Sequence, residues 1–449
     1  MEPDTLASYS NRNIPRYTSY PSAPNFSAAV DERTYRTWLS ELEPETELSL
    51  YLHVPFCRAM CWYCGCHTTV TARDEPISRY LAALSQEIAL VADALPPAMP
   101  VRHIHFGGGS PTVMRPDEFA ALMAALHARF DIAADAEIAI EIDPRSLTDA
   151  MSAALAENGV NRASIGVQSF DPTVQQAINR VQSFETVAAA VEGLRRRGIG
   201  AINLDLIYGL PRQTLGSCLD TIEKALLLDP DRLAAFGYAH VPSFKLHQRK
   251  IDNAMLPESA ARWEQAGAIG EALARAGYVQ IGLDHYAKPR DSLAMAAETR
   301  SLHRNFQGYT TDGCTALIGL GSSSIGRLPK GYVQNIVLIS EYQRRVLEGR
   351  LPVARGYEVS ADDQLRAEVI ERLMCDHKVD LEAVCASFGA DPIALVEAAN
   401  LAPLLADGLI DKRGMVIEMK PDAYPLVRAV AAAFDAHLPK TEGRHARAV

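Results

Sequence analysis

The segment YLHVPFCRAMCWYCGCH, at Tyr51–His67, decides how the rest of this sequence is interpreted. It contains three cysteines at Cys-x3-Cys-x2-Cys spacing and a fourth two residues later: Cys57, Cys61, Cys64 and Cys66. An alternating apolar run at 48–54 leads into it and predicts a buried strand. Pro55 ends that strand, because proline lacks the backbone N–H that a central strand needs. We therefore expect the cysteines on a loop that leaves the end of a strand.

Three thiolates in one short loop can bind a single metal centre. Structural zinc usually has four ligands from two separated pairs, and this sequence has no second pair. A four-iron cluster usually has four cysteine ligands, so three cysteines leave one iron open to a small molecule. The spacing resembles the signature of radical S-adenosylmethionine (SAM) enzymes, in which SAM occupies that iron. Zinc binding and a chance grouping of buried thiols remain the alternatives.

Composition limits the class of protein. With 449 residues, 48% of them hydrophobic, the chain can form a large core and about two or three domains. Its net charge of −11 disfavours a nucleic-acid partner, since phosphate binding needs a basic surface. No apolar run reaches the ~18 residues of a membrane span, and residues 1–10 lack the features of a signal peptide. Eight cysteines, half of them in one loop, fit a reducing compartment, so we expect a cytoplasmic protein without a membrane partner.

A unit of short apolar strand, loop and amphipathic helix repeats from residue 47 to about 286. Six strands are expected at 48–54, 101–106, 136–143, 162–167, 202–207 and 233–239, and a seventh at 278–284. Their alternation with helices predicts a parallel sheet with right-handed crossovers, an α/β fold of the partial (β/α)6-barrel type. In such barrels the functional side chains lie at the carboxyl ends of the strands.

Four regions are expected along the chain. They are an N-terminal arm at 1–46, the barrel at 47–286, an irregular extension at 287–355 that lines the active site, and a mainly helical domain at 356–449. In the arm, Pro15–Pro21 favours either an extended segment on the body of the protein or one that reaches over the active site. The last region is expected to contain helices at 362–378, 380–388, 393–406 and 423–437 and a hairpin around 413–414. This order resembles a winged-helix module, and the acidic balance favours a lid or packing role over DNA binding.

Polar or glycine-rich residues follow each expected barrel strand. They include Gly107–Thr112, Glu141, Asp143, Gly166–Phe170, Asp205 and His240. Glycines let a ligand approach the backbone, although a tight turn or a helix cap would also explain some of these residues. Asp205 lies inside an apolar run, and a buried carboxylate needs a partner such as a ligand hydroxyl or ammonium group. Among the histidines, His53 is favoured as functional because it directly precedes the cysteine loop, whereas His105 and His240 fit satisfied core residues.

With these residues in place, the chain resembles the oxygen-independent coproporphyrinogen III oxidases, radical SAM enzymes of haem synthesis. The resemblance runs essentially end to end. Besides the four cysteines it rests on PRYTSYP at 15–21, YLHVPFC at 51–57, GGGSPT at 107–112, EIDP at 141–144, GVQSF at 166–170, DLIYGLP at 205–211, YAH at 238–240 and HRNFQGYTT at 303–311. Several such strings in one order are more specific than the cysteine motif alone.

The resemblance implies two cofactors and their ligands. A [4Fe-4S] cluster would be bound by Cys57, Cys61 and Cys64, with Cys66 marking the subgroup without being a ligand. SAM on the cluster would contact Tyr51, Gly108, Glu141, Arg180, Asp205 and Ala239, and a second SAM would meet Tyr63, Gly109, Ser110, Gln168 and Ile325. The expected catalytic residues are Tyr51, His53 and Glu141. Departures from the family pattern are Ser110 for Thr, Tyr63 for Phe, and Ser322–Ser324 for a more apolar run, which bears on the second SAM pocket.

The implied reaction is oxidative decarboxylation of two propionate side chains of coproporphyrinogen III to vinyl groups, giving protoporphyrinogen IX. One-electron cleavage of SAM would supply a 5′-deoxyadenosyl radical that takes a hydrogen atom from the propionate β-carbon. The electron would come from a low-potential donor such as flavodoxin or ferredoxin, and a monomer is expected. We expect the positive charge for this tetracarboxylate to come from Arg16, Arg304 and a group formed by Lys245, Arg249 and Lys250.

Three other functions stay open at this point. A haem chaperone-like paralogue shares the cysteine loop and barrel but usually lacks the fourth cysteine and the PRYTSYP string, and both are present here. A radical SAM enzyme that opens or methylates haem would share the core, and product analysis would distinguish it. A zinc-containing scaffold without catalysis is the third alternative, and it would contain no iron.

Overall fold

The computed structural model describes residues 8–9 and 12–438, and its centre is one twelve-stranded sheet. The six strands predicted for the barrel are confirmed, and each runs parallel to the next. They are β1 (Leu48–Val54), β4 (Pro100–Gly108), β5 (Asp131–Ile142), β6 (Arg162–Gln168), β7 (Ala201–Tyr208) and β8 (Arg232–Gly237). Their order in the sheet follows the chain, so each crossover joins neighbouring strands.

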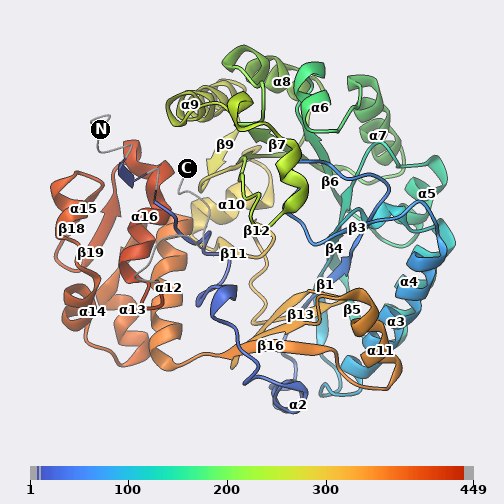
Figure 1. Ribbon diagram of the computed structural model, residues 1–449. Helices are drawn as coiled ribbons and strands as arrows, with labels where there is room; N and C mark the ends of the chain where they lie inside the picture. The colour runs from blue at the N-terminus through green and yellow to red at the C-terminus, as the bar shows by residue number, and fades with distance from the viewer. Residues whose placement is uncertain (1–7, 10–11, 439–449) are drawn as a thin grey trace.

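Helices cover the outer side of this curved sheet (Figure 1). They are α3 (Glu75–Ala92), α4 (Pro116–Arg129), α5 (Asp149–Glu157), α6 (Pro172–Ala177), α7 (Phe184–Arg196), α8 (Leu215–Leu227) and α9 (Ser259–Arg275). Helix α4 begins at Pro116, where the missing N–H leaves no helical hydrogen bond unmade. Side chains alternate along a strand, so Glu141 and Asp205, each between two buried aliphatic residues, face the inner side of the sheet.

The predicted seventh strand at 278–284 is wrong in length and direction. The chain forms β9 (Val279–Ile281) and β10 (His285–Ala287), a short antiparallel pair at the edge of the sheet next to β8. Gly282, with φ of +56°, lies in the reversal between the two strands, and a Cβ there would lie 2.0 Å from Tyr309. The seventh parallel strand is instead β13 (Ala316–Leu320), which pairs with β1 on its other side.

The extension at 287–355 is not irregular, contrary to the prediction. It contains α10 (Ser292–Thr299), β11 (His303–Asn305), β12 (Gly308–Thr310), β13, β14 (Ile325–Leu328), β15 (Gly331–Asn335) and α11 (Ile339–Leu347), followed by β16 (Val353–Glu358). Strands β13 to β16 continue the main sheet beyond β1. Its glycine and serine residues suggested a loop, but Gly319 and Gly326 lie in strands that approach closely.

The C-terminal region is mainly helical, with one three-stranded sheet in the order β17-β19-β18. It contains α12 (Ala361–Asp376), β17 (Lys378–Asp380), α13 (Leu381–Phe388), α14 (Pro392–Ala399), α15 (Ala402–Ala406), β18 (Ile410–Arg413), β19 (Val416–Met419) and α16 (Val427–Ala431). The helix predicted at 393–406 is divided, because Asn400 has a left-handed φ of +46°. The helix predicted at 423–437 contracts to α16 flanked by 3-10 turns, and Pro425 lies in the turn before it.

The described part of the N-terminal arm packs against the C-terminal region. Ile14, Tyr17 and Tyr20 are buried in the same apolar cluster as α12 and α16, and Arg428 donates to the Pro15 carbonyl at 3.0 Å. The arm also contains α2 (Glu32–Ser40), which the sequence did not predict. Within the described part of the chain, no helix combines the length and the hydropathy needed to cross a membrane.

Candidate active site

The cysteine loop is held by a strand pair at its ends and by two side-chain amides that donate to its carbonyl groups. Its first strand, β2 (Phe56–Cys57), pairs with β3 (Thr69–Val70), which closes the loop on itself. The Asn179 amide donates to the Met60 carbonyl at 2.8 Å, and the Gln248 amide donates to the Tyr63 carbonyl at 2.9 Å. The loop that carries the cysteines is therefore held in one conformation by residues from distant segments.

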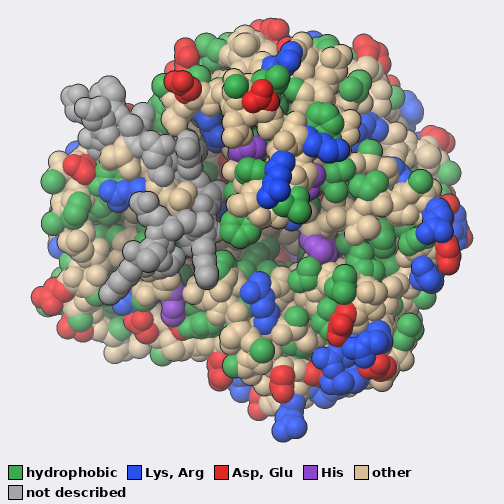
Figure 2. Space-filling model, viewed as in Figure 1, with side chains coloured by type: hydrophobic (Ala, Val, Ile, Leu, Met, Phe, Trp, Pro, Cys, Tyr) green, Lys and Arg blue, Asp and Glu red, His purple; other side chains and the backbone are tan. Residues whose placement is uncertain are grey.

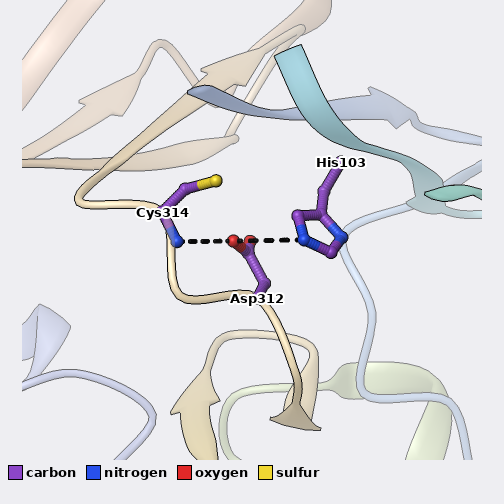
Figure 3. A group of neighbouring side chains, drawn as sticks. All are labelled: His103, Asp312 and Cys314. Atoms are coloured by element: carbon purple, nitrogen blue, oxygen red, sulfur yellow. Dashed lines mark hydrogen bonds and ion pairs between the residues drawn. The ribbon is translucent and has the colours of Figure 1, made fainter. Parts of the chain in front are cut away.

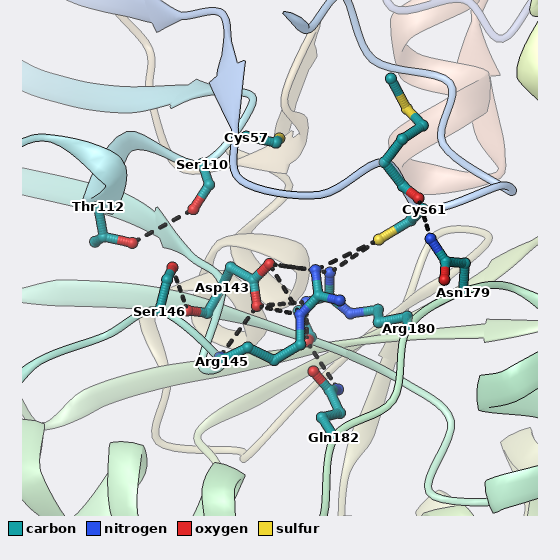
Figure 4. A network of polar contacts seen from close by, with 12 residues as sticks. Cys57, Cys61, Ser110, Thr112, Asp143, Arg145, Ser146, Asn179, Arg180 and Gln182 are labelled. Atoms are coloured by element: carbon teal, nitrogen blue, oxygen red, sulfur yellow. Dashed lines mark hydrogen bonds and ion pairs between the residues drawn. The ribbon is translucent and has the colours of Figure 1, made fainter. Parts of the chain in front are cut away.

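Hydrogen-bond donors lie next to two of the cysteine sulfurs, and Figure 4 shows those at Cys61. The Thr68 hydroxyl donates to Cys57 Sγ at 3.1 Å, and the guanidinium groups of Arg145 and Arg180 each lie 3.5 Å from Cys61 Sγ. Such donors stabilise thiolates, the form that binds metals. Burial raises the pKa of Cys57 to about 11, so a bound cation would be needed to keep that sulfur deprotonated.

The spacing of the three sulfurs tests the predicted cluster against zinc. Two thiolates on one tetrahedral zinc ion lie about 3.8 Å apart, given a zinc–sulfur distance of about 2.3 Å. Within the described ranges 8–9 and 12–438, the cysteines of the loop do not form a group of three ligand atoms all within 4.8 Å of one another. The donor set is all thiolate, with no histidine or carboxylate among the three. The three sulfurs therefore lie farther apart than on a single zinc ion, and an all-thiolate set suits an iron–sulfur cluster.

The glycine loop after β4 lies directly against the start of the cysteine loop. Gly109 donates its N–H to the Val54 carbonyl at 2.9 Å, and Ser110 donates to the Phe56 carbonyl at 2.8 Å. A Cβ at Gly109 would lie 2.5 Å from the Phe56 oxygen, so only glycine permits this approach. Two elements that the sequence singled out separately thus form one surface.

Tyr51, His53 and Glu141 lie beside this surface. The Nε2 of His53 donates to the His67 carbonyl at 3.0 Å, which leaves Nδ1 to accept from the Tyr51 hydroxyl at 3.0 Å. Burial lowers the pKa of His53 to about 4, so the ring is neutral. Glu141 accepts the Gly108 N–H at 3.3 Å. Both nitrogens of His53 are therefore engaged with the protein, which fits a positioning role.

A second polar network lies beside Cys61 and is formed by residues that follow β5 and α6. Arg180 is 6% exposed, donates to the Gly166 carbonyl at 2.6 Å and lies 3.4 Å from Asp143. Burial acts to raise the pKa of Asp143, but the Arg145 hydrogen bond and the charge of Arg180 hold it below its usual value. The sequence did not single out Arg145, although it follows two residues after Asp143. Gln168 adopts φ of +68° at the end of β6 and is 7% exposed.

The remaining predicted site residues are spread around the same rim. Asp205 accepts hydrogen bonds from Ser164 and Asn203, both at 2.8 Å, and burial raises its pKa. Its partners are thus already present in the protein. Ala239 and Tyr63 both offer their carbonyl oxygens to Gln248. Ile325 begins β14, and the nearby Ser322–Ser324 run forms a buried turn behind the sheet.

A chamber of about 980 Å³ opens between the barrel, the arm and the C-terminal region. Four arginines from separate segments line it: Arg16, Arg262, Arg304 and Arg428. Burial, followed by the charges of Arg16 and Arg304, lowers the pKa of Arg428 to about 9. The expected group Lys245, Arg249 and Lys250 does not line the chamber. Lys245 instead donates to the Cys66 carbonyl at 3.0 Å, beside the cysteine loop.

Two family models match the chain. The radical SAM superfamily model matches residues 51–225, and the HemN C-terminal domain model matches residues 359–426. They leave residues 1–50, 226–358 and 427–449 unmatched.

Curated relatives and a solved structure match nearly the whole chain. The oxygen-independent coproporphyrinogen III oxidase of Bradyrhizobium diazoefficiens is 56% identical over 450 residues, covering 100% of both chains. That of Salmonella typhimurium is 39% identical, covering 95% of this chain and 94% of the relative. The structure of coproporphyrinogen III oxidase (HemN) from Escherichia coli, described as a radical SAM enzyme, is 38% identical with a TM-score of 0.91, covering 94% of this chain and 98% of that one. The chain therefore belongs to the oxygen-independent coproporphyrinogen III oxidase family of the radical SAM superfamily.

Proposed function

We propose that this chain converts two propionate side chains of coproporphyrinogen III to vinyl groups, giving protoporphyrinogen IX in haem synthesis. The observation that carries the proposal is the chamber of about 980 Å³ with four arginines on its walls. A substrate with four carboxylates needs several cationic groups, and guanidinium binds carboxylate through two parallel hydrogen bonds. The similarity to named oxidases over the whole chain supports the same reaction.

We further propose that Cys57, Cys61 and Cys64 bind a [4Fe-4S] cluster. When bound, the cluster and SAM supply a carbon radical that removes a hydrogen atom from the substrate. The SAM on the cluster would contact Tyr51, Gly108, Glu141, Arg180, Asp205 and Ala239, and the second SAM would contact Tyr63, Gly109, Ser110, Gln168 and Ile325. In this arrangement Tyr51 and Glu141 touch the cofactor, while His53 orients Tyr51 through its hydrogen bond.

The arm and the C-terminal region would exclude water from the chamber. Arg16 and Thr18 of the arm lie on the chamber wall, as does Arg428 of α16. The contact between Arg428 and the Pro15 carbonyl ties these two walls together. A closed chamber strengthens the pairing of carboxylates with arginines and protects a reactive radical from side reactions.

The electron donor would dock next to the cysteine loop, on a segment between β8 and α9 that we call the basic segment (residues 244–250). The segment contains Lys245, Arg249 and Lys250, and Figure 2 shows separate Lys and Arg side chains on this face of the molecule. Phe244 and Leu246 are 65% and 62% exposed, and the adjacent His247 donates to the Cys64 carbonyl at 2.7 Å. Exposed apolar groups among cations suit a small acidic electron carrier such as flavodoxin or ferredoxin. A cytoplasmic monomer is part of the same proposal.

The test is anaerobic incubation of the reconstituted, reduced protein with SAM and coproporphyrinogen III, scoring protoporphyrinogen IX and 5′-deoxyadenosine together. Both products are expected in the wild type, and neither in Cys61→Ala. Deoxyadenosine without the decarboxylated product would contradict the proposed substrate and favour a paralogue that acts on haem. Absence of both products, with iron present, would contradict the radical chemistry itself.

A further inference from the structure

Three side chains of metal-binding type lie together at the end of the sheet opposite the cysteine loop: His103, Asp312 and Cys314. His103 belongs to the first half of β4 and pairs with Ser49 near the start of β1. The other two lie between β12 and β13. Because β1 separates β4 from β13 in the sheet, an ion held here would join strands on both sides of β1. The family comparisons and the proposed reaction assign no role to this group.

The donor atoms lie close to the separations that one ion requires. The imidazole nitrogen, a carboxylate oxygen and the sulfur all lie within 4.8 Å of one another, and the side chains converge on the Asp312 carboxylate (Figure 3). His103 Nε2 is 3.9 Å from Asp312 Oδ1, which is too long for a hydrogen bond. Nitrogen and oxygen ligands on one tetrahedral zinc ion lie about 3.3–3.6 Å apart. A shift of about half an ångström would place both atoms on an ion.

The charge at Asp312 also favours a cation. Its side chain is 9% exposed, and within residues 8–9 and 12–438 the ion-pair partner of Asp312 is His103, with no Lys or Arg at that distance. The carboxylate accepts the Ser49 hydroxyl at 2.6 Å and the Cys314 N–H at 3.0 Å. These neutral donors orient the carboxylate and leave further lone pairs available. A largely buried carboxylate without a fixed positive partner is costly, and a divalent ion would offset that cost.

We propose that His103, Asp312 and Cys314 bind one zinc ion, distinct from the metal centre of the cysteine loop. A thiolate and an imidazole exclude magnesium and calcium, and a mixed sulfur, nitrogen and oxygen set suits zinc. Binding forms a zinc–sulfur bond, the thiol proton of Cys314 goes to solvent, and no electron is transferred. Water would take the fourth position, and Asp312 and Cys314 border a cavity of about 60 Å³ from which it would enter.

The zinc ion would fasten a wall of the arginine chamber. The segment that carries Asp312 follows directly after the β11–β12 hairpin, which contains Arg304. Fixing this segment to β4 fixes the base of the hairpin. The role is structural, because the site lies at the amino ends of β1 and β4 while the cysteine loop follows their carboxyl ends.

The test is the metal content of anaerobically purified holoenzyme after exhaustive dialysis, measured by inductively coupled plasma mass spectrometry. About one zinc per chain is expected beside the cluster iron in the wild type, falling to about zero in Cys314→Ser and in His103→Ala. Cys218→Ser, a buried thiol in α8, is the matched control and should keep both metals. Zinc near zero in the wild type, or unchanged in Cys314→Ser, would overturn the proposal.

A second measurement excludes zinc held by the cysteine loop and does not depend on the folding of any one variant. In a background with Cys57, Cys61 and Cys64 all changed to Ser, protein produced in zinc-depleted medium supplemented with cobalt(II) is expected to give a thiolate-to-cobalt charge-transfer band. Wild-type holoenzyme from the same medium, whose cluster cysteines are occupied, should give the same band. The band should vanish on adding Cys314→Ser to either protein. A band that survives in Cys314→Ser, or that never forms in the wild type, would contradict the site.

Discussion

Arg180 beside the cysteine loop and Arg428 in the chamber are both buried arginines, but their charges meet opposite surroundings. Burial opposes the charge of each. At Arg180 the neighbouring Tyr63, Asp143 and Cys61 prevail and raise its pKa, whereas at Arg428 the nearby Arg16 and Arg304 add to burial and lower its pKa to about 9. The cysteine-loop region therefore balances its buried cation within the protein, while in the chamber four arginines outnumber the lining carboxylates of Glu258, Glu271 and Asp284.

This difference indicates two kinds of site. A balanced network holds its side chains in place before any ligand arrives, which suits a cofactor that must be oriented. A chamber in which neighbouring arginines lower the pKa of Arg428 is stabilised when an anion enters, which suits a polycarboxylate substrate. The proposed function thus divides between the regions, and each can be disturbed separately.

The largest effect is expected from Cys61→Ala, which disrupts the balanced region. Loss of a cluster ligand should reduce bound iron and bring both 5′-deoxyadenosine and protoporphyrinogen IX below detection. Iron analysis and anaerobic product assays measure this. Cys218→Ala is the control and should keep its iron, since that thiol lies in α8. A Cys61→Ala protein with full iron and activity would show that the loop is not the metal centre.

Arg304→Gln should disturb the chamber while leaving the balanced region intact. A charged hydrogen bond contributes about 1.5–3 kcal/mol, so KM for coproporphyrinogen III should rise roughly 10- to 150-fold. SAM cleavage in the absence of substrate should stay at the wild-type rate. The exposed α11 residue Arg344, changed to Ala, is the control and should leave KM unchanged. Equal affinity for the substrate in Arg304→Gln would remove this arginine from the proposed binding site.

The two regions also differ in how far the sequence predicts them. The cysteine loop, the glycine loop and Glu141 come from consecutive strand ends, and parallel strands bring consecutive ends to one edge, so their grouping could be predicted. Arg262 and Arg428 lie on helices, and no sequence motif around them indicates a binding role. They line the same chamber as Arg16 only because distant segments pack together. Lys245, which we expected near the substrate, contacts the cysteine loop and does not line the chamber, and its role toward the substrate stays a prediction. The extension was predicted as irregular because its glycines, needed for close strand contacts, also mark turns.

Glu87→Gln tests a buried carboxylate that binds the segment after β13. Glu87 lies in α3 and accepts from Gly321 N–H at 2.7 Å, the Tyr342 hydroxyl at 2.6 Å and the Asn335 amide at 2.5 Å. Burial raises its pKa from 4.5 to about 7. The folded state therefore holds this proton more tightly, and the contribution of Glu87 to stability is full below about pH 4.5 and decreases by about 3 kcal/mol as the pH rises to about 7.

The measurement is the free energy of unfolding of wild type and Glu87→Gln between pH 5 and pH 8. The difference between them isolates Glu87, because His53, whose pKa is lowered to about 4, acts in the opposite direction in both proteins. The wild type should lose stability with rising pH relative to the variant. Exposed Glu348→Gln is the control. Parallel pH profiles of wild type and Glu87→Gln would show that Glu87 is ionised throughout this range.

The smallest effect is expected from Lys250→Glu, which changes charge on the exposed basic segment beside the cysteine loop. Lys250 is exposed and lies 5.5 Å from the centre of the Trp62 ring, within the cysteine loop. Reversing one surface charge should slow turnover driven by an acidic electron carrier about 3- to 10-fold at low salt, and the difference should shrink at high salt because screening weakens steering. Turnover driven by a small chemical reductant should stay unchanged, since it needs no docking surface. Lys412→Glu, on β18 of the C-terminal region, is the matched charge control. If both reductants lost rate equally in Lys250→Glu, the residue would act on the loop itself and the docking face would lie elsewhere.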